Sequence, residues 1–163
     1  MKRLILIRHA KSGWDDPMAD DHDRVLTERG RTAAKSIGEW LAAQGYVPDV
    51  MLVSDAARTV ETHRHICDGL GQTPKTSFHP TLYHAAPDTI LDLAMRQPDE
   101  TIAVIAHNPG IAMAAHGLVR TRPRHSRFSD YPTCATTVID FEGDIRVNQG
   151  TCIDFTVPRD LTD

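Results

Sequence analysis

The chain has 163 residues, of which 40% are hydrophobic and 25% charged, and its formal net charge is −4. This length and balance predict a single domain, residues 1–163, that buries a core without disulfides or a structural metal. The acidic balance argues against nucleic acid as a partner. The odd number of cysteines matches no disulfide framework or zinc motif, which indicates reduced thiols and a cytoplasmic location. The three cysteines are Cys67, Cys134 and Cys152.

The apolar run Leu4–Ile7 near the N-terminus is too short for a targeting or membrane-spanning segment. A signal peptide needs an apolar stretch of about 7–15 residues, and a membrane span needs about 20. We therefore expect no membrane association. We also expect the chain to act as a monomer.

The first half of the chain alternates short apolar runs with helical patterns. Arg3–Ile7 is typical of a buried strand, and the polar stretch Ser12–Arg24 is typical of a loop. A helix is predicted to begin with Thr27 as its N-cap and to end at Gly45. The loop carries five aspartates, namely Asp15, Asp16, Asp20, Asp21 and Asp23.

Val50–Val53 predicts a second strand, and a helix follows it that ends before Gly71. Thr76–Leu82 predicts a short third strand. Asp88–Met95 predicts a short helix, with Asp88 placed to cap it.

Thr101–Ala106 has the clearest strand pattern in the chain, and a helix is expected over Ile111–Leu118. Arg120–Pro132 is a basic loop. Cys134–Phe141 and Thr151–Val157 predict two further strands with no helix between them, so we expect an antiparallel pair or an edge. The alternation predicts an α/β three-layer sandwich, in which a mostly parallel mixed sheet is flanked by helices.

Unusual polar residues follow three of the predicted strands. Arg8 and His9 follow the first strand, Arg58 lies just beyond the second, and His107 follows the fourth. Ligands of open α/β sheets bind at the carboxyl ends of the strands, so these residues are candidates for one site. Clustered arginines favour a bound anion and match phosphate oxygens, and nearby positive charge keeps a histidine neutral and nucleophilic.

Five segments resemble one family. Arg8-His9-Ala10-Lys11-Ser12 resembles the Arg-His-Gly signature of the histidine phosphatase superfamily, which includes the cofactor-dependent phosphoglycerate mutases. Its Ala-Lys-Ser variant resembles the small SixA-like phosphohistidine phosphatase branch. The other four segments follow in the family's order and are Leu26–Gly30, Ser54–Thr62, His107–Gly110 and Tyr131–Ala135.

The resemblance implies a phosphoglycerate mutase-like fold without metal or cofactor. It also implies that His9 is the phosphorylated nucleophile and that Arg8, Arg58 and His107 complete the phosphate pocket. Neutral His9 would attack phosphorus, while the arginines and a protonated His107 hold the phosphoryl oxygens. Water would then hydrolyse the phosphohistidine.

Larger relatives donate a proton to the leaving group from a carboxyl in an insertion after the third strand. This chain has no such insertion, and four residues remain as candidates for the acid, namely Asp15, Asp16, His84 and Asp88. Each also has a structural interpretation, since aspartates often stabilise turns and helix starts. The missing insertion favours an open pocket and a large substrate, such as phosphohistidine on a protein. Small phosphoesters remain an alternative.

Several residues near these motifs allow two interpretations. Ser12 and Lys11 would bind phosphate oxygens or face water. The basic loop around Arg120–Arg127 would bind an acidic partner or form a solvated surface. The histidine spacings do not favour a metal site. Two other functions compete with a phosphatase, namely a phosphomutase and a phosphate-binding module without turnover.

Overall fold

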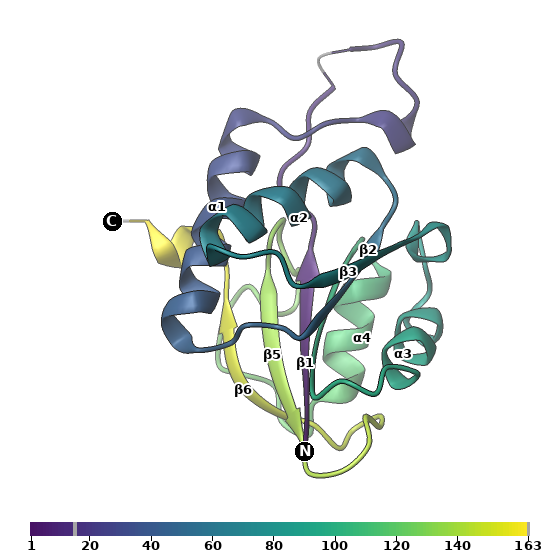
Figure 1. Ribbon diagram of the computed structural model, residues 1–163, viewed down its shortest axis with the longest axis vertical. Coiled ribbons are helices and arrows are strands. Elements are labelled where there is room, and N and C mark those ends of the chain that lie inside the picture. Colours follow the sequence, from purple (N-terminus) through teal and green to yellow (C-terminus); the bar gives the residue numbers. More distant parts are fainter. Residues whose placement is uncertain (15, 163) are drawn as a thin grey trace.

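The computed structural model describes residues 1–14 and 16–162, and within them six strands form one sheet in the order β3-β2-β4-β1-β5-β6 (Figure 1). The parallel strands are β1 (Lys2–Arg8), β2 (Val50–Ser54), β3 (Lys75–His79) and β4 (Thr101–Ala106). The antiparallel pairings are those of β5 (Thr136–Phe141) with β1 and with the edge strand β6 (Thr151–Thr156). The mixed, mostly parallel sheet confirms the predicted fold class.

Helices cover both faces of this sheet. They are α1 (Glu28–Gln44), α2 (Ala57–Leu70), α3 (Pro87–Met95) and α4 (Gly110–Leu118). Short 3-10 turns are η1 (Asp21–Asp23), η2 (Pro80–Leu82) and η3 (Pro158–Leu161). The predicted ends of α1 are confirmed, because the Thr27 side chain accepts from the Gly30 amide at 3.1 Å and Gly45 adopts a left-handed φ of 78°. Gly71 ends α2 in the same way, with φ 75°.

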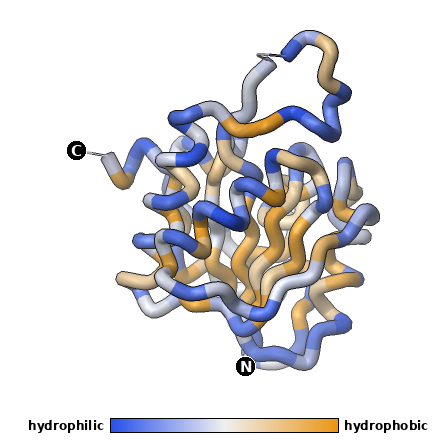
Figure 2. Tube along the Cα trace, turned by 45° about the horizontal axis from the view of Figure 1, so that its top comes forward, coloured by the Kyte–Doolittle hydropathy of each residue, from blue (hydrophilic) through white to orange (hydrophobic). Residues whose placement is uncertain are grey.

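Alternation along the strands divides the core into two layers. Leu4 and Leu6 of β1 pack in the layer that contains α3 and α4. Ile5 and Ile7 pack with α1 and α2 on the other face. All four residues are fully buried, and burial of each such side chain contributes about 1.5–3 kcal/mol. Figure 2 shows the hydrophobic strands at the centre of the molecule.

Several boundaries differ from the sequence expectation, most of them by one residue, and three have a clear local cause. β3 ends at His79 instead of Leu82, because Pro80 starts the turn η2. β5 begins at Thr136, since Cys134 adopts a left-handed φ of 62° that a strand does not accommodate. Asp88 does not cap α3, because the helix begins one residue earlier and Ala86 occupies the N-cap position. Across the described ranges, no helix combines the length and apolar character needed to cross a membrane.

The sheet order places three predicted site segments at one rim. β4 lies between β1 and β2, with Arg8 of β1 paired to Ala106 of β4 and Val53 of β2 paired to Ile105 of β4. Parallel strands in this register end at the same level. The residues that follow them therefore meet at the carboxyl edge.

Candidate active site

His9 directly follows β1, and its side chain is buried at the rim of the sheet. Its Nδ1 lies 2.7 Å from the Ala10 carbonyl oxygen. Because a carbonyl oxygen only accepts hydrogen bonds, Nδ1 carries the proton of the neutral ring and the free electron pair lies on Nε2. Burial, followed by the charges of Arg8 and Arg58, lowers the pKa of His9 to about 3 against the opposing effect of the Ala10 hydrogen bond. The ring is therefore neutral near pH 7.

His107 directly follows β4, and its ring centroid lies 5.3 Å from that of His9. Its Nε2 lies 2.7 Å from Ser54 Oγ at the end of β2, whereas the buried Nδ1 has no hydrogen-bond partner among the described residues. Burial first, and then repulsion from His9 and Arg58, lowers the pKa of His107 to about 3. The ring is therefore neutral near pH 7 before an anion binds. The protonated His107 expected in the complex with a phosphoryl group stays a prediction.

Two arginines complete this group. Arg8 ends β1 and donates from Nη1 to the Tyr131 carbonyl at 3.1 Å. Arg58 lies in the first turn of α2, is 2% exposed, and donates from Nη1 to the Asp21 carbonyl at 2.7 Å. Burial, together with the charge of Arg58, lowers the pKa of Arg8. Two cations therefore lie close together in a poorly solvated place.

Three nitrogen atoms of this cluster lack a hydrogen-bond partner. The Nε atoms of Arg8 and Arg58, and Nδ1 of His107, are buried without a hydrogen-bond partner in residues 1–14 and 16–162. A buried polar group left without a partner costs about 1–3 kcal/mol, and an anion that accepts from these nitrogens offsets that cost. The electrostatics and the free donors together suit an oxyanion such as phosphate.

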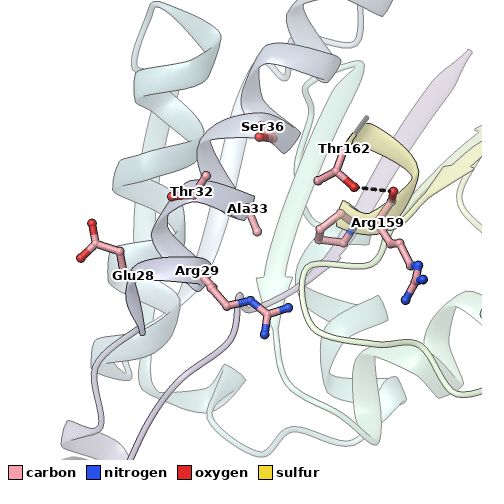
Figure 3. A pocket seen from close by; sticks show the side chains of 8 residues that line it. Glu28, Arg29, Thr32, Ala33, Ser36, Arg159 and Thr162 are labelled. Atoms are coloured by element: carbon pink, nitrogen blue, oxygen red, sulfur yellow. Dashed lines mark hydrogen bonds between the residues drawn. The ribbon is translucent and has the colours of Figure 1, made fainter.

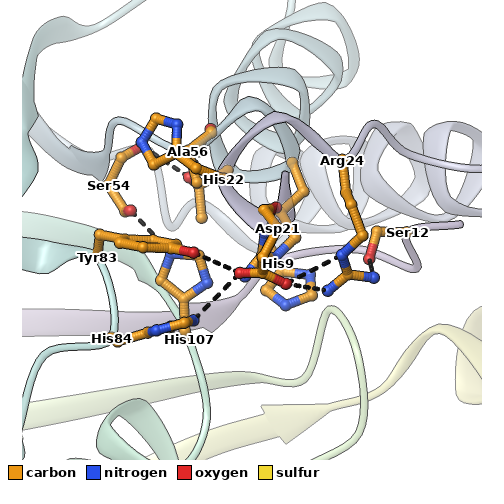
Figure 4. A network of polar contacts seen from close by, with 12 residues as sticks. His9, Ser12, Asp21, His22, Arg24, Ser54, Ala56, Tyr83, His84 and His107 are labelled. Atoms are coloured by element: carbon orange, nitrogen blue, oxygen red, sulfur yellow. Dashed lines mark hydrogen bonds and ion pairs between the residues drawn. The ribbon is translucent and has the colours of Figure 1, made fainter. Parts of the chain in front are cut away.

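The Asp21 carboxylate, from the turn η1, links this cluster to its surroundings. Its Oδ2 lies 3.0 Å from Arg58 Nη2 and accepts a hydrogen bond from the Tyr83 hydroxyl. Its Oδ1 accepts from Arg24 Nε at 3.1 Å, and His84 Nε2 lies 3.4 Å from Oδ2 (Figure 4). The Tyr83 hydrogen bond, and then the bond and charge of Arg58, hold the pKa of Asp21 well below its usual range. Asp21 is therefore an ionised anchor for the Arg58 guanidinium.

The chain is similar to proteins of one superfamily. A model of the histidine phosphatase superfamily (branch 1) matches residues 4–83. An uncharacterized protein of Mycobacterium tuberculosis is 31% identical over 163 residues, which cover 94% of this chain and 100% of that protein. The chain belongs to the histidine phosphatase superfamily. An uncharacterized chloroplastic protein of Arabidopsis thaliana is 34% identical over 126 residues, and the match spans 70% of this chain but 57% of the plant protein.

A solved structure is similar to this chain over nearly its whole length. That structure is the crystal structure of a candidate phosphohistidine phosphatase SixA from Agrobacterium tumefaciens. The TM-score is 0.80 with 26% sequence identity, and the alignment covers 96% of this chain and 98% of that one. The SixA-like branch suggested by the sequence is confirmed. The phosphoglycerate mutase-like sheet flanked by helices is confirmed as well.

The other predicted site residues lie at different distances from the cluster. Ser12 lies beside the cluster, where its Oγ accepts from Arg24 Nη1 at 3.0 Å. Lys11 is exposed, and its carbonyl accepts from the Thr27 amide at 2.9 Å. Asp16 accepts from the Met18 amide at 3.0 Å in a turn.

The remaining candidates for the acid differ in their distance from the cluster. His84 lies within it, since its ring centroid is 5.6 Å from that of His107. Asp88 is exposed in the first turn of α3. Asp15 lies outside the described residues.

Sequence reasoning missed Asp21, Tyr83 and the partnership of Ser54 with His107. Asp21 stood among several aspartates of a polar loop, and the residue that it anchors is 37 positions away in sequence. Its contact with Arg24, three residues along the chain, was the one local signal available. The conformation that brings this loop over α2 is set by tertiary packing.

Other features of the surface carry no comparable chemistry. A hollow of about 710 Å³ lies between α1 and η3, with Glu28, Arg29 and Arg159 as its charged lining (Figure 3). Within the described ranges, no group of three or more His, Cys, Asp or Glu side chains is arranged to hold a metal. In the basic loop, Arg127 pairs with Asp130 and His125 pairs with Asp160.

Proposed function

We propose that the protein is a phosphatase that transfers a phosphoryl group from its substrate to Nε2 of His9 and then to water. Membership of the superfamily supports phosphatase activity in general. The observation that carries the proposal is the hydrogen bond from His9 Nδ1 to the Ala10 carbonyl, because it leaves the electron pair on Nε2.

The reaction then has two steps. In the first, the Nε2 electron pair forms a bond to phosphorus while the bond to the leaving atom breaks, in line with the attack. Arg8 and Arg58 hold the equatorial oxygens, where charge spreads in the transition state. In the second step water attacks phosphorus, the P–N bond breaks, and its electron pair returns to His9.

His107 contributes a further donor to this pocket. If the Ser54 hydroxyl donates to Nε2, the proton of the neutral ring lies on Nδ1, which is the buried nitrogen without a partner in the described chain. A bound phosphate dianion also favours the charged form of the ring and raises its pKa. With that tautomer His107 donates to phosphate through Nδ1 in the neutral ring, and the charged ring donates through the same atom.

We propose phosphohistidine on a protein as the substrate. β3 ends at His79 and α3 begins at Pro87, so only residues 80–86 connect them on this side of the site. A connection of this length supplies no long covering segment, which suits a side chain presented by a macromolecule. The similarity to the Agrobacterium protein supports the same substrate class. A small phosphoester is the alternative.

The test compares released phosphate from a phosphohistidine peptide, a phosphoserine peptide and p-nitrophenyl phosphate. Wild-type protein and His79→Asn, a variant outside the cluster, should prefer the phosphohistidine peptide, and His9→Asn should release none. Release without transfer to an added sugar acid excludes a phosphomutase. Equal turnover by His9→Asn, or binding of phosphate without turnover of any donor, would contradict the proposal.

A further inference from the structure

Phosphoryl transfer to His9 leaves one requirement without an assigned residue. The atom that departs from phosphorus takes the bonding electron pair, and a proton delivered to the leaving group lowers the barrier. This requirement, and the inference below, rest on the proposed function. The donor must carry a proton at neutral pH and lie near the cluster without competing for the phosphate oxygens.

Three carboxyl groups, namely Asp21 of the cluster and the candidates Asp16 and Asp88, do not meet these conditions. Asp21 is close, but its Tyr83 and Arg58 contacts hold its pKa well below the usual range, so it has no proton to give. Asp16 is committed to the Met18 amide in a turn of the outer loop. Asp88 is exposed in the first turn of α3, where a carboxylate stabilises the helix dipole in its ionised form.

His84 lies where such a donor is needed. Its ring stacks on Tyr83 with centroids 4.0 Å apart and 21° between the planes, and it meets His107 edge-on at 5.6 Å. Its Nε2 lies 3.4 Å from Asp21 Oδ2, and 56% of its side chain is exposed, so the ring can exchange protons with water. The ring is therefore fixed on the solvent side of the phosphate pocket.

The backbone at this position is strained. His84 has φ 52°, in the left-handed region that residues with a Cβ rarely adopt. Strain of this kind persists where the surrounding structure enforces it, commonly at functional sites. Here it accompanies a ring clamped between Tyr83 and a carboxylate, an arrangement that orients an imidazole for proton transfer.

The geometry points to His84 as the proton donor to the leaving group, with Asp21 as the residue that positions it. The Nε2–H of the imidazolium stays on the ring and faces the Asp21 carboxylate, 3.4 Å away, so Nδ1 gives its proton as the bond from phosphorus to the leaving atom breaks. The neutral ring then removes a proton from the attacking water while the P–N bond to His9 breaks. His84 ends the cycle protonated, and the products are the protonated leaving group and phosphate.

The rim position of His84 also fits the proposed substrate. A phosphohistidine leaves as neutral imidazole when the ring nitrogen that does not carry phosphorus receives a proton. That nitrogen lies on the far side of the substrate ring from phosphorus, and so toward solvent. A donor at the mouth of the pocket reaches it, whereas the buried His107 faces the phosphoryl group.

The experiment uses the dependence of rate on the leaving group. His84→Gln keeps a hydrogen-bonding side chain but cannot deliver the proton. Its kcat/KM should fall by about 100-fold on phenyl phosphate, a loss typical of a missing general acid, and by less than about threefold on p-nitrophenyl phosphate, whose phenolate leaves without a proton. The matched control is His79→Gln. The His79 ring bonds Ser77 Oγ at 2.7 Å and no side chain of the described cluster, so this variant should match the wild type on both donors.

Two further variants separate catalysis from structure. His84→Ala should show the same selective loss on phenyl phosphate. Asp21→Asn should lose more activity on phenyl phosphate than on p-nitrophenyl phosphate, because the donor is less well oriented. Equal losses on both donors, or none, in both His84 variants would overturn the assignment and leave the His9 mechanism intact. Absence of turnover by the wild-type protein on every donor would instead overturn the proposed function.

Discussion

Acidification from pH 7 to pH 5 should destabilise the protein through His9 and His107. Burial is the main cause that lowers the pKa of each ring to about 3, so both remain neutral in the folded state at pH 5. An unfolded histidine has a pKa of about 6.5 and is almost fully protonated at pH 5. Because the unfolded state binds more protons, the free energy of unfolding decreases as the pH is lowered. The decrease is about 2 kcal/mol for each ring over this interval.

The assay is urea unfolding at both pH values for the wild type and for two variants. His9→Gln and His107→Gln should each lose about 2 kcal/mol less than the wild type on acidification. His22→Gln is the control. The Asp55 contact raises the pKa of His22, so the His22 ring stabilises the folded state on acidification, and its replacement should not reduce the loss of stability between pH 7 and pH 5. If acidification costs the two glutamine variants as much as the wild type, the rings are not neutral and buried as described.

Three further predictions concern the surroundings of the cluster. Asp21→Asn should lower kcat/KM on every donor by about tenfold or more, because Arg58 loses its anchor, whereas Asp23→Asn on the same turn should not. Gly30→Ala should cost about 1–3 kcal/mol in urea unfolding, since its Cβ would lie 2.2 Å from the Lys11 carbonyl oxygen. Iodoacetamide should leave kcat/KM unchanged, because burial raises the pKa of the Cys134 thiol to about 12, and inactivation would instead indicate a cysteine enzyme.

The local features of the fold were predictable because they depend on nearby residues. The branched aliphatic run of β1 is buried on both faces, as its continuous apolar pattern indicates. The Thr27 cap and the Gly45 end of α1 follow from side-chain and backbone chemistry at single positions. The order of the strand ends also placed Arg8, His9, Arg58 and His107 together, since the carboxyl ends of neighbouring parallel strands share one edge.

The features that sequence could not supply depend on tertiary contacts. The loop carrying Asp21 folds over α2 and reaches Tyr83, which is 62 residues away, and no local pattern encodes that contact. The protonation of His107 stays a prediction, because the positive charge was expected with a phosphoryl group bound. Without an anion, burial and then the neighbouring charges lower the pKa of the ring. Likewise, the electron pair on His9 Nε2 follows from one carbonyl contact.

The most direct test of the account is to locate the phosphoryl group on the enzyme during turnover. The protein is mixed with a phosphohistidine peptide, quenched in base within milliseconds, and examined by mass spectrometry and by nuclear magnetic resonance, which distinguishes the two ring isomers. The account predicts phosphorus on Nε2 of His9. Phosphorus on Nδ1, phosphorus on another residue, or turnover without any phosphorylated enzyme would contradict it.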